Sequence, residues 1–346
     1  MTIELLNMDC MEYMRGQPDN SFDAIITDPP YFKVKADAWD RQWDKPAAFL
    51  QWLGSVADEW QRLLKPNGSL YCFASPQMAA RVEVLLSERF NILNNIRWVK
   101  EAGWHQKASK DSLRSFLSPW ESCIFAEHYG ADNIAKGEAG YIAKCDELRG
   151  FVFEPLRAYL AGEWARAGLT NKDANIATGS QMAGHYMTTT QWALPTEVKY
   201  KQLRDYANRE GGNYLRREYE DLRREYEYLR REYEYLRREY EDLRRPFSVT
   251  ADVPYTDVWT FKTVQAYPGK HPCEKPQDMM RHIVSVSTKP GGRVLDCFAG
   301  SGATGIACNA LGRDFVGTEL DPDYYAAAMR RFEAETAQTD MFRSDA

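Results

Sequence analysis

Residues 293–305 read RVLDCFAGSGATG, and this stretch decides the fold. The residues from Arg293 to Phe298 are apolar enough for a buried strand, the turn contains G-x-G-x-x-G, and a helix is expected over 303–311. A second strand is expected over 314–317, with the acidic Glu319 at its end. Glycines keep such a turn tight and let a ligand approach the backbone, while the acid can accept hydrogen bonds from ribose hydroxyls. This order predicts an α/β fold with a nucleotide-type ligand.

Asp296 narrows the choice of ligand. A dinucleotide would place its pyrophosphate at the N-terminus of the helix that follows, where the Asp296 carboxylate would repel it. S-adenosylmethionine carries no phosphate, and its amino group and sulfonium are cationic, so the same carboxylate becomes favourable. Only 27 residues follow Glu319 in the 346-residue chain, too few to complete a dinucleotide domain. The missing strands are therefore expected from the N-terminal part.

The first 130 residues show the same alternation of strands and helices. Strands are expected over 3–6, 24–27, 69–74, 91–99 and 123–127. Helices are expected over 49–64 and 78–88, with a further one near the C-terminus over 323–335. The segment 65–68, Lys-Pro-Asn-Gly, is expected to stop the first of these helices. Strands that alternate with helices predict a mostly parallel, twisted sheet with both faces covered, to which both α/β pieces contribute.

The stretch TDPPYF at 27–32 directly follows an apolar strand. Proline removes a ladder donor and keeps the preceding residue out of the helical region, so the two prolines explain why the strand stops. They leave the carboxylate of Asp28 and the ring of Tyr31 unexplained.

Four motifs together carry a family resemblance. They are DPPY at 28–31, HPCEKP at 271–276, FAGSG at 298–302 and Glu319 within VGTELDPDYYAAAMRR. In type and order they resemble those of the amino-methylating DNA methyltransferases, and the position of DPPY before the cofactor loop resembles the permuted β group. The resemblance covers roughly residues 1–130 and 255–335. It implies a Rossmann-like methyltransferase fold that uses S-adenosylmethionine, with a circularly permuted motif order and a helical target-recognition insert. Region 165–206 also resembles a segment of some phage-encoded members.

Amine chemistry agrees with this resemblance. The exocyclic amine of adenine is a poor nucleophile because its lone pair is delocalised into the ring. Asp28 and the carbonyl of Pro29 can accept the two N6 hydrogens and favour a pyramidal nitrogen, which is catalysis by orientation and electrostatics. The two rings of Pro29 and Pro30 fix φ and hold that carbonyl in place. The base must leave the duplex to react, and Tyr31 offers a ring to stack on it.

The resemblance also implies the residues that bind the cofactor. Asp9 would bind the adenine, although a lone aspartate after a strand is more often a helix cap. Glu319 would hold the ribose. The methionine part would be surrounded by Lys275, Asp296, Phe298, Gly300, Ser301 and Gly302. His271 is assigned no role in catalysis, and no metal site is expected.

The middle of the chain has a different character. Residues 149–211 are aromatic and polar, with cap and turn signals between short helical runs, which suits a small module like a helix-turn-helix. Residues 215–245 form a near-perfect heptad array of the type LRREYEY. The expected domains are 1–148 (catalytic half), 149–211 (target-recognition module), 212–246 (heptad-repeat helical arm) and 247–346 (cofactor-binding half).

Two interpretations of the heptad arm are open. The heptads can be aligned with tyrosine at position a (219, 226, 233, 240) and leucine at position d (222, 229, 236, 243). This alignment places Glu at g and Arg at e, the pattern of charge pairing between helices, so the arm could join two protomers as a coiled coil. Tyrosine at every a position is a weak dimer core. The alternative is an expanded repeat that persists because it does no harm. Ten Arg are cancelled by eight Glu and two Asp, so the arm is a poor DNA-gripping rod.

Contacts to DNA are harder to assign. A locally basic, aromatic stretch suits contact with phosphates or filling of the gap that a flipped base leaves in the duplex. It is equally compatible with a solvated loop. Its members are Arg97, Trp98, Lys100, Trp104, His105, Lys107, Lys110 and Arg114. The middle module holds side chains of the kinds that read base edges, which are also ordinary cap and turn residues; they are Ser180, Gln181, His185, Thr188, Thr189 and Gln191. Module 149–211 as a whole is the better candidate for target recognition.

Composition excludes several classes. A formal net charge of −6 argues against gripping nucleic acid through overall charge, although a local basic face is compatible with it. Seven scattered cysteines without a C-x-x-C pair indicate reduced thiols in a cytoplasmic protein. The N-terminus does not read as a signal peptide, and no apolar run is long enough to span a bilayer.

The sequence thus predicts a site-specific DNA methyltransferase that transfers a methyl group from S-adenosylmethionine to adenine N6 in duplex DNA, of the type found in restriction-modification systems. Cytosine N4 is the main alternative because its amine chemistry is the same, but members with that specificity more often carry Ser in place of Asp28. RNA-modifying and protein-modifying relatives usually carry Asn there. A catalytically idle DNA-binding or coiled-coil assembly protein is the remaining alternative, against which the intact DPPY and FAGSG motifs speak.

Overall fold

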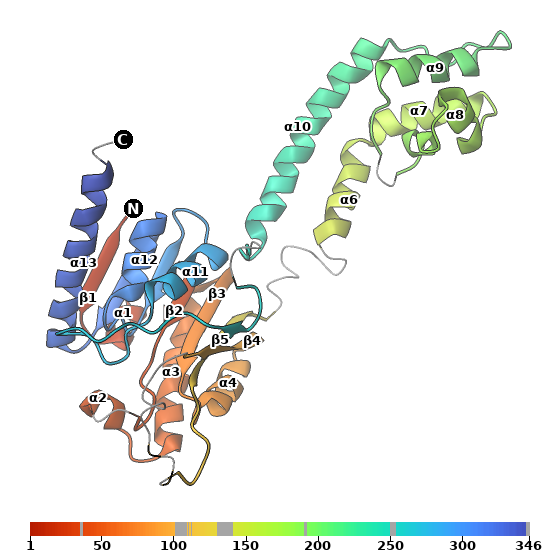
Figure 1. Cartoon of the computed structure of the whole chain (residues 1–346). Coiled ribbons are helices and arrows are strands. Elements are labelled where there is room, and N and C mark those ends of the chain that lie inside the picture. The colour runs from red at the N-terminus through yellow and green to blue at the C-terminus, as the bar shows by residue number, and fades with distance from the viewer. Residues whose placement is uncertain are drawn as a thin grey trace. The chain divides into compact units, whose positions relative to one another are not determined.

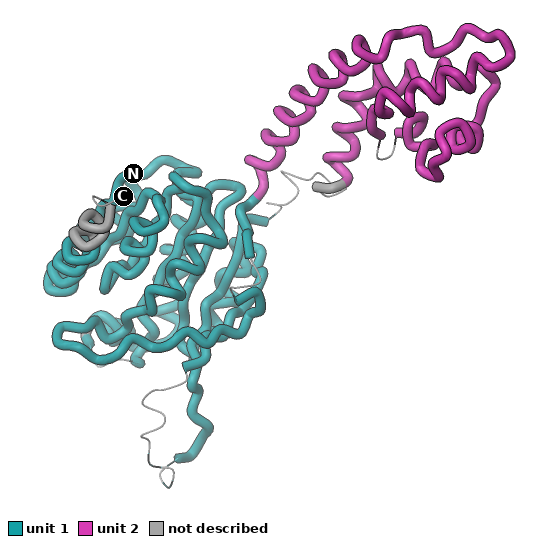
Figure 2. The backbone as a smooth tube through the Cα atoms, turned by 45° about the horizontal axis from the view of Figure 1, so that its top comes forward, with its two compact units in different colours: residues 1–131, 245–346 teal, residues 132–244 magenta. Residues whose placement is uncertain are grey.

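The computed structural model describes residues 1–34, 37–100, 109, 111, 113–129, 141–189, 192–249 and 254–343. The chain forms two compact units, shown in different colours in Figure 2. Unit 1 combines Met1–Ala131 with Arg245–Ala346, and unit 2 is Asp132–Arg244. The two ends of the chain therefore build one unit, and the middle builds the other.

Unit 1 is built on one mixed sheet (Figure 1). Among the described residues the sheet has eight strands, in the order β1-β8-β7-β2-β3-β5-β4-β6. The strands are β1 (Ile3–Asn7), β2 (Phe22–Thr27), β3 (Leu64–Ala74), β4 (Phe90–Val99), β5 (Trp120–His128), β6 (Val258–Trp259), β7 (Arg293–Asp296) and β8 (Asp314–Glu319). Among the strand pairs of the described residues, only β3–β5 and β4–β5 are antiparallel. Although β7 and β8 come last in the chain, they lie between β1 and β2, so both α/β pieces belong to one sheet, as predicted.

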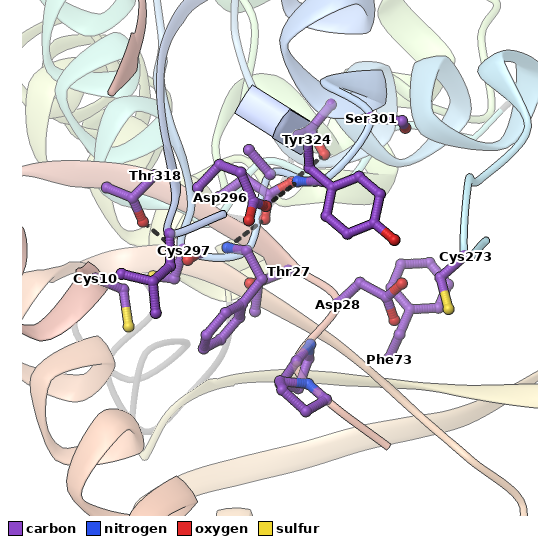
Figure 3. A pocket seen from close by; sticks show the side chains of 18 of the residues that line it. Cys10, Thr27, Asp28, Phe73, Cys273, Asp296, Cys297, Ser301, Thr318 and Tyr324 are labelled. Carbon is purple, nitrogen blue, oxygen red and sulfur yellow. Dashed lines mark hydrogen bonds between the residues drawn. The ribbon is translucent and has the colours of Figure 1, made fainter. Parts of the chain in front are cut away.

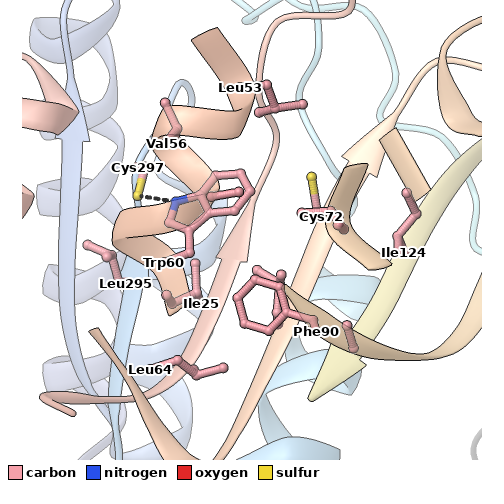
Figure 4. Close-up of a cluster of buried hydrophobic side chains, with 14 of the residues drawn as sticks. Ile25, Leu53, Val56, Trp60, Leu64, Cys72, Phe90, Ile124, Leu295 and Cys297 are labelled. Carbon is pink, nitrogen blue, oxygen red and sulfur yellow. Dashed lines mark hydrogen bonds between the residues drawn. The ribbon is translucent and has the colours of Figure 1, made fainter. Parts of the chain in front are cut away.

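Helices cover both faces of this sheet. The described helices of unit 1 are α1 (Cys10–Arg15), α2 (Ala38–Arg41), α3 (Pro46–Leu63), α4 (Ala79–Ser87), α11 (Gln277–Ser287), α12 (Ala303–Leu311) and α13 (Pro322–Arg343). Apolar residues of α1, α3 and α4 form one core with the strands, and those of α11 and α12 form a second core on the other face. In the first core the fully buried indole of Trp60 donates to Cys297 Sγ over 3.2 Å (Figure 4). The predicted α/β, Rossmann-like fold is confirmed.

The segment 65–68, predicted as a stop between helix and strand, differs in detail. It lies inside β3, which begins at Leu64 directly after α3. The register against β2 shifts here, because Leu64 pairs with Phe22 and Ser69 already pairs with Ala24. The Lys65 ammonium pairs with Asp23 at 2.8 Å and anchors this irregularity. Proline and glycine thus interrupt the ladder locally without ending the strand.

Unit 2 is helical among its described residues. Its elements are α6 (Tyr141–Val152), α7 (Glu154–Arg166), α8 (Asn171–Thr178), the short 3-10 helix η3 (Ala183–Tyr186), α9 (Glu197–Ala207) and α10 (Tyr219–Leu243). They share one core, whose largest fully buried side chains are Trp164 and Tyr200. A capping box of Thr170 and Asp173 begins α8, and Gly179 in the left-handed conformation ends it, which are the cap and turn signals seen in the sequence.

The heptad array forms one continuous helix, α10. Most of its a and d side chains belong to the core of unit 2, although Leu243 at the last d position is exposed. The Phe153 ring lies 5.3 Å from Tyr226 and 5.8 Å from Tyr233. Lys144 and Arg149 of α6 each lie 5.6 Å from a tyrosine ring, of Tyr240 and Tyr233 respectively, so α6 and α10 run antiparallel. Much of the face that one of the two interpretations assigned to a second protomer is therefore covered within the chain.

All seven cysteines are free thiols, and five of them are buried. Among the described residues, no helix is both long and apolar enough to cross a membrane.

Candidate active site

The predicted site residues meet at the carboxyl ends of three adjacent parallel strands. Asp28 follows β2, Asp296 ends β7 and Glu319 ends β8, and parallel strands present these ends at one edge of the sheet, where α/β proteins bind ligands. A pocket at this edge is shown in Figure 3. The predicted residues that line it are Asp9, Asp28, Pro29, Pro30, Tyr31, Lys275, Asp296, Phe298, Gly300, Ser301 and Glu319.

Gly302 is the predicted site residue that does not line this pocket. It adopts the left-handed conformation at φ 72° and immediately precedes α12. Its N–H donates to the carbonyl of Ala299 at 2.8 Å, which closes the glycine turn. The structure therefore gives Gly302 a role in the shape of the loop, since only glycine adopts this conformation without strain.

Buried contacts hold the DPPY segment in place. The Tyr31 N–H donates to Asp40 Oδ1 at 2.6 Å, and the Ser75 hydroxyl donates to the Tyr31 carbonyl at 3.3 Å. Both prolines are buried. Phe32, which the sequence left without a role, adopts φ 60° and packs its ring 5.8 Å from Phe49. The segment is thus fixed on both sides of the residues that are predicted to act on the substrate.

Lys275 lies at the centre of a charged cluster. Its ammonium donates to Asp28 Oδ2 and, at 3.1 Å, to the Tyr31 hydroxyl, and it lies 3.5 Å from Glu121 Oε2. The Tyr31 hydroxyl donates to the same Glu121 oxygen at 3.1 Å, and Lys100 donates to Glu121 Oε1. The sequence placed Lys275 near the methionine part of the cofactor, whereas these contacts tie it directly to the predicted catalytic carboxylate.

Burial and charge shift the pKa values of this cluster. Burial raises the pKa of Asp28, and the ammonium of Lys275 offsets only part of that rise. Burial would also raise the pKa of Glu121, but Lys275 and Lys100 together lower it to about 2. Burial opposes the charge on Lys275, yet Asp28 and Glu121 raise its pKa above the ordinary value. The cluster therefore holds two ammonium groups and two carboxylates, of which Asp28 is the easier to protonate.

One oxygen of Asp28 is free to receive a ligand. Oδ2 accepts from Lys275, while Oδ1 is buried and has no hydrogen-bond partner among the residues that the structure describes. A buried acceptor without a donor is costly, so native proteins rarely leave one without a reason. Because Asp28 lines the pocket, a donor group of a bound substrate can satisfy this oxygen.

The cofactor side of the pocket is organised by Asp296. Its Oδ1 accepts from the Phe298 N–H at 3.1 Å, and its Oδ2 accepts from the Thr304 hydroxyl at 2.6 Å. Burial raises the pKa of Asp296 to about 7, against the smaller opposing effect of these hydrogen bonds. A cationic ligand group beside this carboxylate would favour its ionised form.

Glu319 and Asp9, which the sequence predicts to bind the adenosine part, both line the pocket. Glu319 Oε2 accepts from the Gly300 N–H at 2.9 Å, and Oε1 accepts from the Asp321 N–H at 2.9 Å, so the carboxylate is fixed at the pocket wall. Asp9 Oδ1 accepts from the N–H groups of Met11 and Glu12 and therefore caps α1. Asp9 thus satisfies the ordinary cap interpretation and also lines the pocket.

Aromatic side chains that the sequence did not single out complete the walls. The rings of Trp39 and His271 stack at 6.5 Å, and His271 meets Tyr324 edge-on at 4.5 Å. Trp52 lies 5.8 Å from Phe298 of the glycine loop. These rings come from segments far apart in the chain, and they give the pocket flat apolar surfaces suited to planar ring systems.

Glu121 and Lys100 are two charged residues of the Lys275 cluster whose role the sequence did not reveal. The predicted strand 123–127 began two residues after Glu121, and Lys100 belonged to a basic stretch that suits either phosphate contact or a solvated loop. A lone acid in the otherwise apolar start of β5 was the available signal. In the same basic stretch, Arg97 lies 3.9 Å from the Trp120 ring, and the Trp98 indole donates to the Phe261 carbonyl at 2.8 Å.

Several residues predicted to contact DNA lie outside the described part of the chain. They are Trp104, His105, Lys107, Lys110 and Gln191. Of the candidate base readers in unit 2, Ser180 accepts from the Met182 N–H at 3.3 Å in the turn that follows α8. The individual base readers therefore stay unassigned.

The fold and the pocket together define a Rossmann-like methyltransferase. Residues 22–330 match the family model described as DNA methylase (N6_N4_Mtase), and the chain belongs to this family. It is 25% identical to type II methyltransferase M2.DpnII of Streptococcus pneumoniae, over 96% of this chain and 90% of the relative. It is 24% identical to the DNA adenine methyltransferase YhdJ of Escherichia coli K12, over 95% of this chain and 82% of the relative.

Solved structures support the same fold. The M1.HpyAVI–SAM complex aligns with a TM-score of 0.50 and 19% identity, over 95% of this chain and 100% of that chain. The cytosine-N4-specific PvuII DNA methyltransferase aligns with a TM-score of 0.52 and 13% identity, over 96% of this chain and 89% of that chain. At these identities the likeness concerns the fold alone.

S-adenosylmethionine is the cofactor of this methyltransferase, and the pocket residues fit it. The Asp296 carboxylate suits a cationic amino group, and Glu319 suits ribose hydroxyls. Gly300 adopts φ 50°, and a Cβ there would lie 3.0 Å from the His271 ring, so a side chain would fill the space beside the loop. In the described ranges, no cluster of three or more His, Cys, Asp or Glu side chains could hold a metal ion.

Proposed function

We propose that this DNA methyltransferase modifies N6 of adenine within a specific duplex sequence, after flipping the target base out of the helix. The observation that carries the proposal is the unpaired Oδ1 of Asp28, a buried acceptor beside the cofactor pocket. The N6 amine of a flipped adenine is a donor that would satisfy it.

The residues of the chain would act mainly by orientation. Asp28 Oδ1 and the Pro29 carbonyl accept the two N6 hydrogens, so that the nitrogen lone pair points at the methyl group. The cofactor supplies an electrophilic methyl group on a sulfonium. With the cofactor bound, its sulfur would keep the electron pair of the broken sulfur–methyl bond, and Asp28 Oδ1 would take the proton that the amine loses on forming its bond to the methyl group. Burial keeps the Tyr31 phenol neutral, because it raises its pKa well above the ordinary value.

The choice of adenine over cytosine N4 rests on Asp28 and on the relatives. Cytosine-N4 members more often carry Ser at this position, and the similar protein YhdJ is described as a DNA adenine methyltransferase. Cytosine N4 is the second candidate, because the fold is shared with the cytosine-N4-specific PvuII enzyme. The motif order further supports the permuted β group.

We further assign target recognition to residues 149–211 within unit 2. The separate helical core of this unit supports that assignment, since a recognition module must hold its own shape. The cytoplasmic location, the restriction-modification context and the phage-related origin stay predictions. A homodimer through the arm would require α10 to give up its packing on Phe153, so we do not assign the arm that role.

The proposal is tested with labelled S-adenosylmethionine and plasmid from a methylation-free host. After incubation with the purified full chain, nucleoside analysis should show label in N6-methyladenine. Label in N4-methylcytosine would favour the second candidate, and absence of label from DNA would overturn both. Asp28→Ala should lose transfer by at least about 100-fold while cofactor affinity stays within about threefold, because Asp28 binds the substrate amine and not the cofactor.

A further inference from the structure

The cluster around Lys275 poses a problem for the proposed reaction. The ammonium engages Asp28 in the structure, yet Asp28 must accept a hydrogen from the target amine. A cation that stays tightly on this carboxylate withdraws electron density from the acceptor and opposes the transfer of a proton to it. The site therefore needs a second place for the ammonium when a base is bound.

Glu121 offers that second place. Its Oε2 lies 3.5 Å from the Lys275 ammonium and already accepts from the Tyr31 hydroxyl at 3.1 Å. Its other oxygen, Oε1, is held by Lys100. The Glu121 side chain is 16% exposed and that of Lys275 only 6%. Burial of an ionised carboxylate costs free energy unless the charge is paired, which argues that Glu121 has a specific role in the site.

We propose that Glu121 is a positioning residue for methyl transfer: it shares the Lys275 ammonium with Asp28, draws it away when the target amine arrives, and through the Tyr31 hydroxyl fixes the ring on which the base stacks. The inference rests on the proposed function. Lys100 determines how strongly Glu121 competes with Asp28 for the Lys275 ammonium, because it already neutralises part of the Glu121 charge.

The inference predicts the pH dependence of the rate through Asp28. Transfer needs ionised Asp28, so the rate falls as the pH falls through the pKa of this group. Lys275 lowers that pKa and Glu121 raises it, in addition to the rise caused by burial. The other titratable groups near Asp28 are Tyr31, Cys72, Cys123 and Asp296. Burial raises the pKa of the phenol and of both thiols, which keeps them neutral over the acid range.

Two substitutions should shift the acid limb of the pH–rate profile, which is the pH range where the rate falls as Asp28 becomes protonated, in opposite directions. In Glu121→Gln, Glu121 no longer competes with Asp28 for the Lys275 ammonium, and a negative charge near Asp28 is lost. Both changes lower the pKa of Asp28, so the acid limb should move to lower pH. The rate on the plateau should still fall by about 10- to 100-fold, because Lys275 now competes with the base. In Lys100→Gln, Glu121 attracts Lys275 more strongly, so the limb should move to higher pH.

The experiment measures single-turnover methylation by the full chain with labelled cofactor. Its substrate is a duplex that carries the target site found by methylation-aware sequencing. Glu127→Gln is the matched control: Glu127 lies on the same strand β5, is buried, and pairs with Arg245 at 2.5 Å outside the pocket. It should lower thermal stability without shifting the limb. Glu121→Asp, which restores the charge, should recover part of the rate.

The outcomes separate the two claims. If the wild-type chain puts no label into DNA, the proposed function fails. If the wild type is active but Glu121→Gln keeps its plateau rate, or its acid limb stays or moves to higher pH, the inference alone is wrong. Should Glu121→Gln fail to fold, the Lys100→Gln profile decides: a limb that does not move to higher pH overturns the inference. Cofactor affinity in each folded variant should stay within about threefold of wild type, since neither residue is assigned to the cofactor.

Discussion

At the scale of single residues, the two carboxylates Asp28 and Asp296 do different work in one pocket. Asp28 is paired with Lys275 through one oxygen and leaves the other unpaired among the described residues. Asp296 has both oxygens engaged by donors of its own segment, the Phe298 N–H and the Thr304 hydroxyl. The first arrangement suits an incoming amine, and the second fixes a negative charge beside the cofactor loop.

The raised pKa of Asp296 makes cofactor binding depend on pH. In the free protein burial raises this pKa to about 7, and a cationic amino group binds the ionised carboxylate better than the neutral acid. Below about pH 7 binding must therefore expel a proton, and the Kd for S-adenosylmethionine should rise by up to about tenfold per pH unit. Above that pH the Asp296 contribution should be flat. Calorimetric titration between about pH 5.5 and 7.5 measures the slope.

Asp296→Asn provides the control for this prediction. It keeps the size of the side chain but cannot ionise, so cofactor binding should be weaker and the slope near pH 7 should vanish. A slope that persists in Asp296→Asn would assign the titration to another group, such as Glu319, whose pKa is also raised by burial.

At the scale of elements, α10 shows how a heptad pattern can be used inside one chain. The pattern specifies an amphipathic helix with an a/d face of tyrosine and leucine, and any apolar surface of matching shape can cover that face. In this fold the partner is supplied by α6 and Phe153. Tyrosines at position c, such as Tyr228 and Tyr235, point away from this contact and are well exposed.

Two tyrosines in one repeat provide a matched test of this packing. Tyr233 is 7% exposed and contacts Phe153, whereas Tyr235 is 63% exposed. Tyr233→Ala should lower the local unfolding free energy of unit 2 by roughly 2–4 kcal/mol, and Tyr235→Ala should change it by less than about 0.5 kcal/mol. Hydrogen exchange of α6 and α7 amides in the full chain measures the difference. Equal effects of the two substitutions would show that α10 does not pack on α6 in solution.

At the scale of the whole molecule, the two units have separate cores. The hydrophobic clusters of unit 1 contain no described residue from 132–244, and the cluster of unit 2 contains none from outside this range. Within unit 1, Arg245 pairs with Glu127 at 2.5 Å, so the chain returns to unit 1 close to the end of β5. Unit 2 is thus an insertion between two neighbouring points of unit 1, an arrangement that proteins tolerate well.

Removal of unit 2 should therefore separate cofactor binding from target recognition. With residues 132–244 replaced by a short Gly/Ser linker, unit 1 should fold and bind S-adenosylmethionine with a Kd within about threefold of the full chain, because the pocket residues all lie in unit 1. Methylation of the target duplex should fall by at least about 100-fold if unit 2 supplies specific DNA contacts. Site-specific methylation by the shortened chain would contradict that assignment, and loss of cofactor binding would contradict the independence of unit 1.

Much of this architecture follows from local features that can be recognised in the sequence. The glycine turn at 298–302 and the prolines at 29 and 30 restrict the backbone directly, so strand ends, loop and pocket edge can be placed without a structure. Alternation of strands and helices predicted a mostly parallel sheet with both faces covered. The structure has this sheet, with β5 antiparallel to β3 and to β4. The helix α3 does end before the segment 65–68, as predicted, but the sequence did not show that this segment lies inside β3, because the pairing with β2 resumes at Ser69 after a register shift.

What only the tertiary structure decided are contacts between distant segments. Lys275 is 247 residues from Asp28 in the chain, and its ammonium meets Glu121 of a third segment; no local spacing signals such a triad. The partner of the heptad face is undetermined for a related reason, since an amphipathic pattern records that a face is buried and not what buries it. The sequence by itself determined the backbone of the site and the class of cofactor. Folding determined which charges surround Asp28, because electrostatic contacts depend on distance in space and not on separation along the chain.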